Sequence, residues 1–276
     1  MQQTTIAKAI TYTGIGLHSG QDVTITIKPA LSDTGIVFAR IDLPGAPQVA
    51  ATASNVTNAM RATTLEKGLA KVFTVEHLLA AFFAMEVDNC LVEINAVEPP
   101  VADGSSLPFV QIIQEAGVVE QNASRQFISV TEAQTVRVND KFITILPYDG
   151  FRVTFTSINS HPMLGVQFGD YEITRDSFIS EIASARTIGF MHEVEQLKSQ
   201  GLALGGSLEN AVVYDDVKAL TPLRFQDELV RHKILDIIGD LALAGRIRGH
   251  VIAVKSSHAL NTALAKKIVD HILVRS

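Results

Sequence analysis

The chain has 276 residues, of which 47% are hydrophobic and 19% charged, and its formal net charge is −6 at pH 7. This much apolar sequence with so little charge excludes a disordered chain and a highly charged coiled coil. The acidic balance argues against a nucleic-acid-binding protein, which needs a basic face for phosphates. The length suits one large domain or two modest ones.

The cysteine content and the lengths of the apolar runs indicate the cellular compartment. The single cysteine, Cys90, cannot form an intrachain disulfide, and we expect it to be a buried thiol in a strand. The first residues lack the basic start and apolar core of a signal peptide. The plainest apolar run, residues 78–85, is far shorter than the roughly 20 residues of a membrane span. We therefore expect a cytoplasmic protein without a transmembrane segment.

Strand and helix patterns alternate along the first hundred residues. Val and Ile alternate with polar residues over 23–28, which predicts a half-buried strand, and residues 35–41 predict another. An apolar run with good helix formers predicts a helix over 74–85, with Thr74 as its N-cap. A strand over 89–96 and a short helix over 108–116 follow.

The second half repeats this order. Residues 150–156 match residues 20–26 in the placing of Gly, Val-Thr and Thr. Val230-Arg231-His232 likewise matches Val75-Glu76-His77 at the start of an apolar helix, which leads to a strand over 249–255 and another helix. This similarity predicts an internal duplication.

The duplication predicts two similar α+β domains, 1–122 and 123–276, each with its own hydrophobic core. The break between them is expected in the short polar stretch 121–124.

The two matches differ in spacing. Val23 to Val153 is 130 positions and His77 to His232 is 155, so the second half carries about 25 extra residues (155 − 130) between strand and helix. The natural place is residues 184–211, which contain an amphipathic helix pattern over 192–199. Long segments outside a repeated scaffold are often binding elements, so we expect this insertion to serve function.

The candidate chemistry lies on the helix that begins near residue 230. Residues four apart share a helical face, so His232, Asp236 and Asp240 form one polar stripe on an otherwise apolar helix. Buried ionisable groups are costly unless they are paired or bind a metal. His232 and Asp236 have the spacing to bind one zinc ion, but a structural hydrogen bond between a buried histidine and aspartate fits equally well.

A third ligand would come from Glu76-His77 on the matching helix. Adjacent helical residues diverge by about 100°, so we expect His77 to bind the metal and Glu76 to face the attacking water. Neither the HExxH pattern nor its inverse is present. His258 follows a strand, where Asp240 could orient it, and His18 lies in a Gly-rich turn; for each histidine alone, a structural role fits as well.

Five short motifs together resemble one known family. They are Gly14-Ile15-Gly16-Leu17-His18, Thr74-Val75-Glu76-His77-Leu78, Ser184-Ala185-Arg186-Thr187, Val230-Arg231-His232-Lys233 with Asp236, and Lys255-Ser256-Ser257-His258-Ala259-Leu260. In this order, from about residue 4 to about residue 265, the chain is similar to the UDP-3-O-acyl-N-acetylglucosamine deacetylases, zinc amidases of the committed step of lipid A synthesis. The resemblance implies two similar α+β domains, helices sandwiched between the sheets, and an active site at the domain interface.

The resemblance also implies roles for the site residues. His77, His232 and Asp236 would bind Zn²⁺, although Fe²⁺ accepts the same ligands. Glu76 would be the general base that takes a proton from water at the metal. His258 would be the general acid, or a cation that stabilises the intermediate.

Further roles concern the substrate, a UDP-linked acylated sugar. Asp240 would hold His258, and Thr187 would donate its hydroxyl to the oxyanion. The residues expected to contact the substrate are Lys233, Lys255 and His18 at the diphosphate, and Ile188, Gly189, Phe190, Glu193, Gly205 and Ala211 around a hydrophobic passage for the acyl chain. We expect a monomer, and leave open a peripheral contact with a membrane.

The chain departs from the family pattern at the uridine site. Well-known members carry an Asp-Phe pair ahead of Asn-His-Pro, whereas here Ile158-Asn159 precede Ser160-His161-Pro162. Uridine recognition must therefore use other groups, or be weaker. Ile188 also stands where Phe is common. Both changes bear on substrate affinity rather than on the type of reaction.

Two other classes of function remain open at this point. A small-molecule kinase would fit the Gly-rich loops, but residues 201–207 match neither phosphate-loop pattern. A catalytically silent metal-binding or partner-binding module would keep the metal ligands without needing Glu76 as a base.

Overall fold

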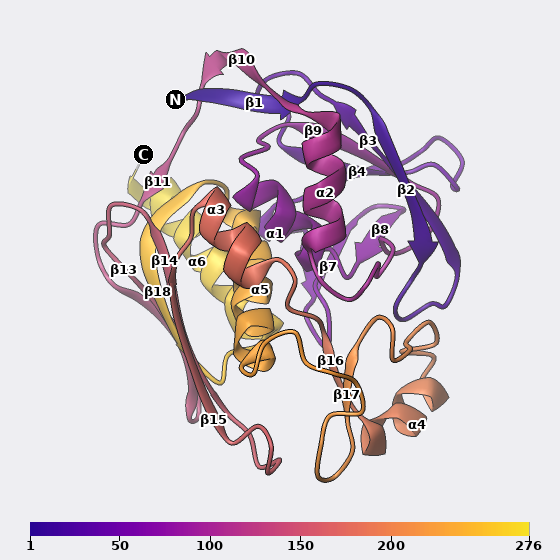
Figure 1. The fold of residues 1–276 in the computed structure, drawn as a ribbon. Coiled ribbons are helices and arrows are strands. Elements are labelled where there is room, and N and C mark those ends of the chain that lie inside the picture. The colour runs from indigo at the N-terminus through magenta and orange to yellow at the C-terminus, as the bar shows by residue number, and fades with distance from the viewer. Residues whose placement is uncertain (276) are drawn as a thin grey trace.

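The computed structural model describes residues 1–275, which form two main β-sheets with helices between them and three smaller sheets (Figure 1). The first half contains β1 (Gln2–Ile6), β2 (Ile10–Ile15), β3 (Asp22–Pro29), β4 (Ile36–Arg40), β5 (Gln48–Ala50), the 3-10 turn η1 (Ala53–Asn55), β6 (Val56–Asn58), β7 (Thr64–Lys67), β8 (Ala70–Phe73), α1 (Glu76–Ala84), β9 (Cys90–Ile94), α2 (Leu107–Ala116) and β10 (Val118–Ser124). The second half contains β11 (Ile128–Ser129), β12 (Gln134–Val138), β13 (Lys141–Leu146), β14 (Phe151–Ile158), β15 (Val166–Glu172), α3 (Arg175–Ser177), the π-helical turn η2 (Phe178–Ile182), β16 (Ile188–Phe190), α4 (Met191–Ser199), β17 (Val212–Tyr214), α5 (Glu228–Leu241), the 3-10 turn η3 (Ala242–Ala244), β18 (Ile247–Val254) and α6 (His258–Arg275). The strands and helices expected from the patterns are therefore confirmed, as is the α+β class.

The two main sheets share one topology. The first has the order β2-β3-β9-β4-β5 and the second the order β12-β13-β18-β14-β15, with β11 beside β18. In each five-strand order the third and fourth strands are parallel and the other neighbours antiparallel, and the additional strand β11 is parallel to β18. This repeated arrangement is what a duplication predicts.

The strand match that suggested the duplication paired two strands that do not correspond in the sheets. By position in the sheets, β14 corresponds to β4, whereas the sequence comparison had aligned residues 150–156 with β3. β14 begins 115 positions after β4 (151 − 36), against 155 between the two histidines, so the excess is about 40 residues (155 − 115) rather than 25. Alternation of apolar residues marks a half-buried strand but carries no information about its place in the sheet.

Two features of the structure bear on the expected division into two domains. The expected boundary at residues 122/123 falls inside β10, which pairs antiparallel with β1. Most buried apolar residues form one cluster that draws on both halves, including Phe38, Phe82, Phe155 and Phe178, and a small second cluster contains Leu164, Val212, Tyr214 and Leu229. The cores merge because α1 and α5 lie against each other between the sheets (Figure 1).

Helix α1 does not begin as expected. Thr74 lies two residues ahead of Glu76 in the left-handed region, with φ of 55°, and its hydroxyl donates to the buried Glu98 instead of capping the helix. The same carboxylate accepts the backbone N–H groups of His18 and Ser19. Glu98 therefore ties the Gly-rich turn around His18 to the segment that leads into α1.

The C-terminal end of α1 is capped from the second half of the chain. Arg246 donates to the carbonyl oxygens of Phe82, Phe83 and Val87, and its Nε lies 2.8 Å from Oδ1 of Asp88. A cation is favourable at this end of a helix, where the last carbonyls have no partner within it. Both side chains of the ion pair are largely buried, with 13% and 9% exposure.

Replacing Arg246 with methionine is expected to destabilise the protein by about 3 kcal/mol, because a buried aspartate loses a charged partner and α1 loses its cap. For a chain of this size that corresponds to a melting point lower by roughly 6–12 °C, measurable by thermal denaturation. Arg248→Met is the matched control, since its pair with Asp149 is exposed (40% and 95%). Equal shifts for the two variants would contradict this role.

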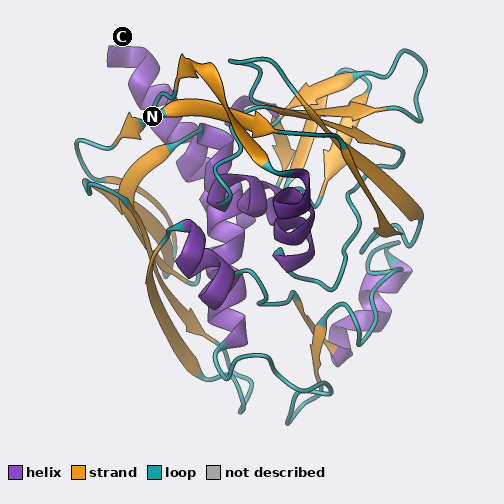
Figure 2. Cartoon of the chain, turned by 45° about the horizontal axis from the view of Figure 1, so that its top comes forward, coloured by secondary structure: helices purple, strands orange, loops and turns teal. Residues whose placement is uncertain are grey.

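The insertion projects from the body of the molecule, as Figure 2 shows. Strands β16 and β17 pair in parallel and lead into and out of a segment containing α4, which confirms the helix expected over 192–199. No residue of α4 is buried. Among residues 1–275, no helix has the length and apolarity needed to span a membrane.

Candidate functional site

The site begins where α1 and α5 cross at very close range. A Cβ atom placed on Gly239 of α5 would lie 2.0 Å from the carbonyl oxygen of Glu76, the first residue of α1. Only glycine allows this approach. The crossing brings Glu76 and His77 beside His232, Asp236 and Asp240.

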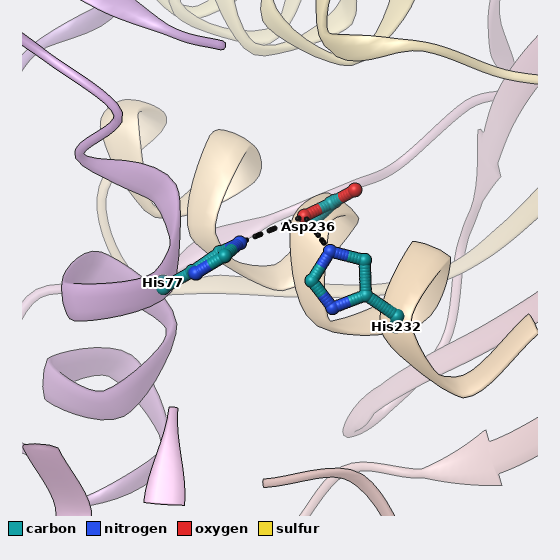
Figure 3. Close-up of side chains that lie close together, drawn as sticks. All are labelled: His77, His232 and Asp236. Carbon is teal, nitrogen blue, oxygen red and sulfur yellow. Dashed lines mark ion pairs between the residues drawn. The ribbon is translucent and has the colours of Figure 1, made fainter. Parts of the chain in front are cut away.

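Three side chains converge on one point at this crossing. Nε2 of His77 lies 3.6 Å and Nε2 of His232 3.4 Å from Oδ1 of Asp236. Figure 3 shows His77 reaching from α1 toward the other two residues on α5. All three are buried, and among the described residues they form a group able to hold a metal ion.

The donor set fits a tetrahedral metal ion. Ligand bonds of about 2.0–2.1 Å place neighbouring ligand atoms roughly 3.3 Å apart, close to the two distances observed. Oδ1 of Asp236 is buried and has no hydrogen-bond partner among the described residues, which is costly unless a cation binds there. Nδ1 of His232 lies 3.1 Å from the carbonyl oxygen of Ala185, which aims Nε2 at Asp236.

A second group adjoins the first. Nδ1 of His258 lies 2.9 Å from Oδ2 of Asp240, and its Nε2 lies 3.9 Å from both Glu76 Oε1 and Asp236 Oδ2. Asn261 also donates to Oδ2 of Asp240. The imidazole is therefore held on one side by Asp240 and faces the metal-ligand group with the other.

The charges of the site follow from this packing. Burial opposes protonation of His258, but the carboxylates of Asp240, Asp236 and Glu76 raise its pKa to about 10. Burial lowers the pKa of His232 to about 3, which favours the neutral ring that binds metals. Burial also opposes ionisation of Asp236, yet Coulombic interactions with His232, Lys233 and His258 hold its pKa well below the usual range.

Thr187 is placed by a tight contact with the loop after β9. Its backbone N–H donates to the carbonyl of Gly104, whose φ is 86°, and a Cβ atom there would lie 2.0 Å from the carbonyl oxygen of Asn210. The expected oxyanion donor therefore borders the same cavity as the metal-ligand group.

A cavity of about 540 Å³ opens over these side chains. Its polar end contains His18, Glu76, His77, Thr187, His232, Lys233, Asp236 and His258. The insertion contributes most of the remaining lining, including the apolar residues Ile188, Gly189, Met191, Val194, Leu197, Ala203, Gly206, Leu208, Ala211 and Val213, and Leu17, Ala59, Arg61, Thr74, Ser256 and Ser257 come from other segments. An apolar arm joined to a cluster of ionisable groups suits a ligand with a hydrocarbon chain.

Not every expected substrate residue lies in this cavity. Lys255 pairs with Asp140 and stays outside the lining, although its neighbours Ser256 and Ser257 belong to it. Lys233 lies in the cavity, where its Nζ is 3.0 Å from Oδ2 of Asp236. Gly205 packs against the turn before His18, and its N–H donates to the Leu17 carbonyl.

Two expected residues line a separate hollow of about 360 Å³. Phe190 and Glu193 lie there together with Asn159 and His161, from the segment that replaces the family's Asp-Phe pair. Nε2 of His161 is 2.8 Å from the Asp215 carbonyl oxygen, which fixes the ring at the edge of this hollow.

The sequence patterns missed Gly104, Gly239 and Thr63. Each acts through a contact between segments far apart in the chain, which no local pattern reports. A lone glycine on a well-patterned helix is the one available signal for Gly239, since such a glycine usually has a packing reason. Thr63 contacts both Glu76 and Asp240, and nothing in its sequence surroundings singles it out.

The chain is similar to known proteins over nearly its whole length. The profile of the family described as UDP-3-O-acyl N-acetylglycosamine deacetylase matches residues 3–270. Relatives named UDP-3-O-acyl-N-acetylglucosamine deacetylase are 48% identical in Geobacter sp. (strain M21), over 97% of this chain and 88% of the relative, and 45% identical in Marinobacter nauticus, over 97% and 90%. The relative of that name in Hahella chejuensis is 44% identical, over 98% of this chain and 91% of the relative.

Proposed function

The chain belongs to the UDP-3-O-acyl N-acetylglycosamine deacetylase family, and on that premise we propose that it hydrolyses the N-acetyl group of UDP-3-O-acyl-N-acetylglucosamine in lipid A biosynthesis. The products are acetate and the free amine. The observation that carries the proposal is the convergence of His77 and His232 on Oδ1 of Asp236, a buried carboxylate oxygen without a hydrogen-bond partner among the described residues. These side chains lie beneath a cavity with an apolar arm. Membership of a deacetylase family argues against the alternative of a small-molecule kinase.

The three converging residues would hold Zn²⁺, with Fe²⁺ as the other ion that accepts two imidazoles and a carboxylate. When bound, such an ion supplies Lewis acidity, which polarises the amide carbonyl and makes water a better nucleophile. Two imidazoles and one carboxylate leave a coordination position open, as catalytic sites require.

The protein's own groups then move the protons. As water adds to the carbonyl carbon, Oε1 of Glu76 takes its proton. Nε2 of His258 donates a proton to the leaving nitrogen as the C–N bond breaks, while Nδ1 remains bonded to Asp240. The Thr187 hydroxyl donates to the carbonyl oxygen as negative charge develops there. Acetate and the amine result.

The remainder of the substrate would extend in two directions from the amide. The acyl chain would enter the apolar arm built by residues 188–213, and Lys233 and His18 would lie nearest the diphosphate. Lys255 would have to leave Asp140 to reach it. We propose that the enzyme acts in the cytoplasm as a monomer.

The decisive experiment is a product analysis with purified, metal-loaded protein and UDP-3-O-acyl-N-acetylglucosamine. We expect one acetate released per free amine formed, with the ester-linked acyl chain intact. Release of the fatty acid instead would identify an esterase, and absence of both products would refute the proposed function.

Blocking the apolar arm is expected to discriminate between substrates. Ala211→Phe places a bulky ring in the lining, and overpacking typically costs about 1–3 kcal/mol. Activity on a long-chain substrate should fall by about 5–150-fold, while a short-chain analogue should be hydrolysed nearly as before. Ser199→Phe, on exposed α4 outside the cavity, is the control. Equal losses on both substrates would contradict this placement of the chain.

A further inference from the structure

Thr63 is a buried residue at the point where the two halves of the site meet. It directly precedes β7, and its exposed fraction is 0%. β7 pairs with β8 so that Thr64 lies opposite Phe73, the last residue of β8 before the chain enters α1. The hairpin therefore returns Thr63 to the side of the first turn of α1.

Two hydrogen bonds leave this one residue for two different carboxylates. The backbone N–H of Thr63 donates to Oε2 of Glu76 at 3.1 Å, and its hydroxyl donates to Oδ1 of Asp240 at 2.5 Å. Oε1 of Glu76 is the oxygen that faces His258. Thr63 thus holds the rear oxygen of the expected base and leaves the front oxygen available.

The contact with Asp240 completes the set of donors around a buried carboxylate. Oδ2 accepts from His258 Nδ1 and Asn261 Nδ2, both at 2.9 Å, whereas Oδ1 accepts from the Thr63 hydroxyl. A carboxylate held at both oxygens cannot rotate about its Cβ–Cγ bond without losing a hydrogen bond, which is costly where water cannot replace it.

We propose that Thr63 is a positioning residue of the deacetylase, which fixes the plane of the Asp240 carboxylate and through it the direction of the His258 ring. The proposal rests on the proposed function. Asp240 does not line the cavity, so its influence passes through His258. Partners one step behind such groups typically contribute 10–100-fold to activity or affinity.

The chain allows the side-chain contact to be removed alone. Thr63→Val keeps the shape and the backbone N–H to Glu76 but removes the hydroxyl, while Thr63→Ser keeps the hydroxyl. Thr64→Val makes the same change one residue along, on a buried threonine of β7.

We expect Thr63→Val to lower kcat by about 10–100-fold with KM within about twofold and metal content unchanged. Thr63→Ser and Thr64→Val should stay within about threefold of the unmodified enzyme. In a His258→Ala background, Thr63→Val should add almost nothing, because residues that act as one unit are not additive. An unchanged kcat, or a full additive loss in that background, would overturn the proposal. If valine prevents folding, Thr63→Ala removes the same hydroxyl and is judged by the same outcomes.

A second readout is independent of activity. The proton on Nδ1 of His258, bonded to a buried carboxylate, should give a downfield NMR signal that is absent from His258→Ala. We expect the signal in the unmodified protein and Thr63→Ser, and its shift or loss in Thr63→Val. An unaltered signal in Thr63→Val would contradict the positioning role of Thr63, whether or not the protein releases acetate. The positioning role and the deacetylase function can therefore be refuted independently.

Discussion

Replacing Asp236 with asparagine is expected to remove most of the bound metal and nearly all of the activity. Asparagine lacks the negative charge of the aspartate carboxylate, whose buried Oδ1 faces His77 and His232 and has no hydrogen-bond partner among the described residues. The site of the variant therefore attracts a cation less strongly. Metal ions contribute several kcal/mol to hydrolysis, so the rate should fall by about a thousandfold or more. Metal content by mass spectrometry and acetate release measure the two effects.

The control for this variant lies on the same helix. Asp227→Asn makes the same chemical change at the N-terminal end of α5, where the carboxylate pairs with Arg231. It should keep its metal and its activity. Full metal occupancy together with normal turnover in Asp236→Asn would exclude the site described above.

Glu76→Gln is expected to lower kcat by about 10²–10⁴-fold while the metal stays bound. Glutamine keeps the shape of the side chain and an oxygen for the Thr63 N–H, but it cannot take a proton from water. Acetate release, metal content and melting point should be measured on the same preparation, so that a loss of turnover is separated from a loss of structure.

This variant also decides between an enzyme and a silent metal-binding module. A silent module would show no dependence on Glu76. Glu66→Gln on strand β7, where the side chain is 39% exposed, provides the same substitution away from the cavity and should behave as the unmodified protein. Loss of metal from Glu76→Gln would instead indicate that this carboxylate is a ligand.

Local patterns were sufficient for the elements that carry the expected metal ligands. The i, i+4 spacing of His232 and Asp236 and the repeated helix start at His77 placed all three on apolar helices, and the helices are there. The amphipathic pattern over 192–199 likewise located α4. These features are encoded within a few residues, which is the range over which periodicity is informative.

Features that depend on distant contacts were not predictable in this way. The start of α1 was misplaced because Thr74 bonds to Glu98, 24 residues away. The strand correspondence was misplaced because two amphipathic strands look alike wherever they lie in a sheet. Thr63 was missed because its importance arises from Asp240, which is 177 positions distant.

The close crossing at Gly239 has a consequence for how much the rest of the protein can vary. The spacing of the two helices is set there by backbone touching backbone, not by the sizes of interlocking side chains. Substitutions among large apolar residues farther along α1 or α5 would tilt the two helices about the Gly239–Glu76 contact. They would change the distance between the helices at that contact much less. His77, one residue from the contact on α1, and Asp236, three residues from it on α5, would move least. Substitutions in the surrounding core should therefore change the relative positions of His77 and Asp236 very little.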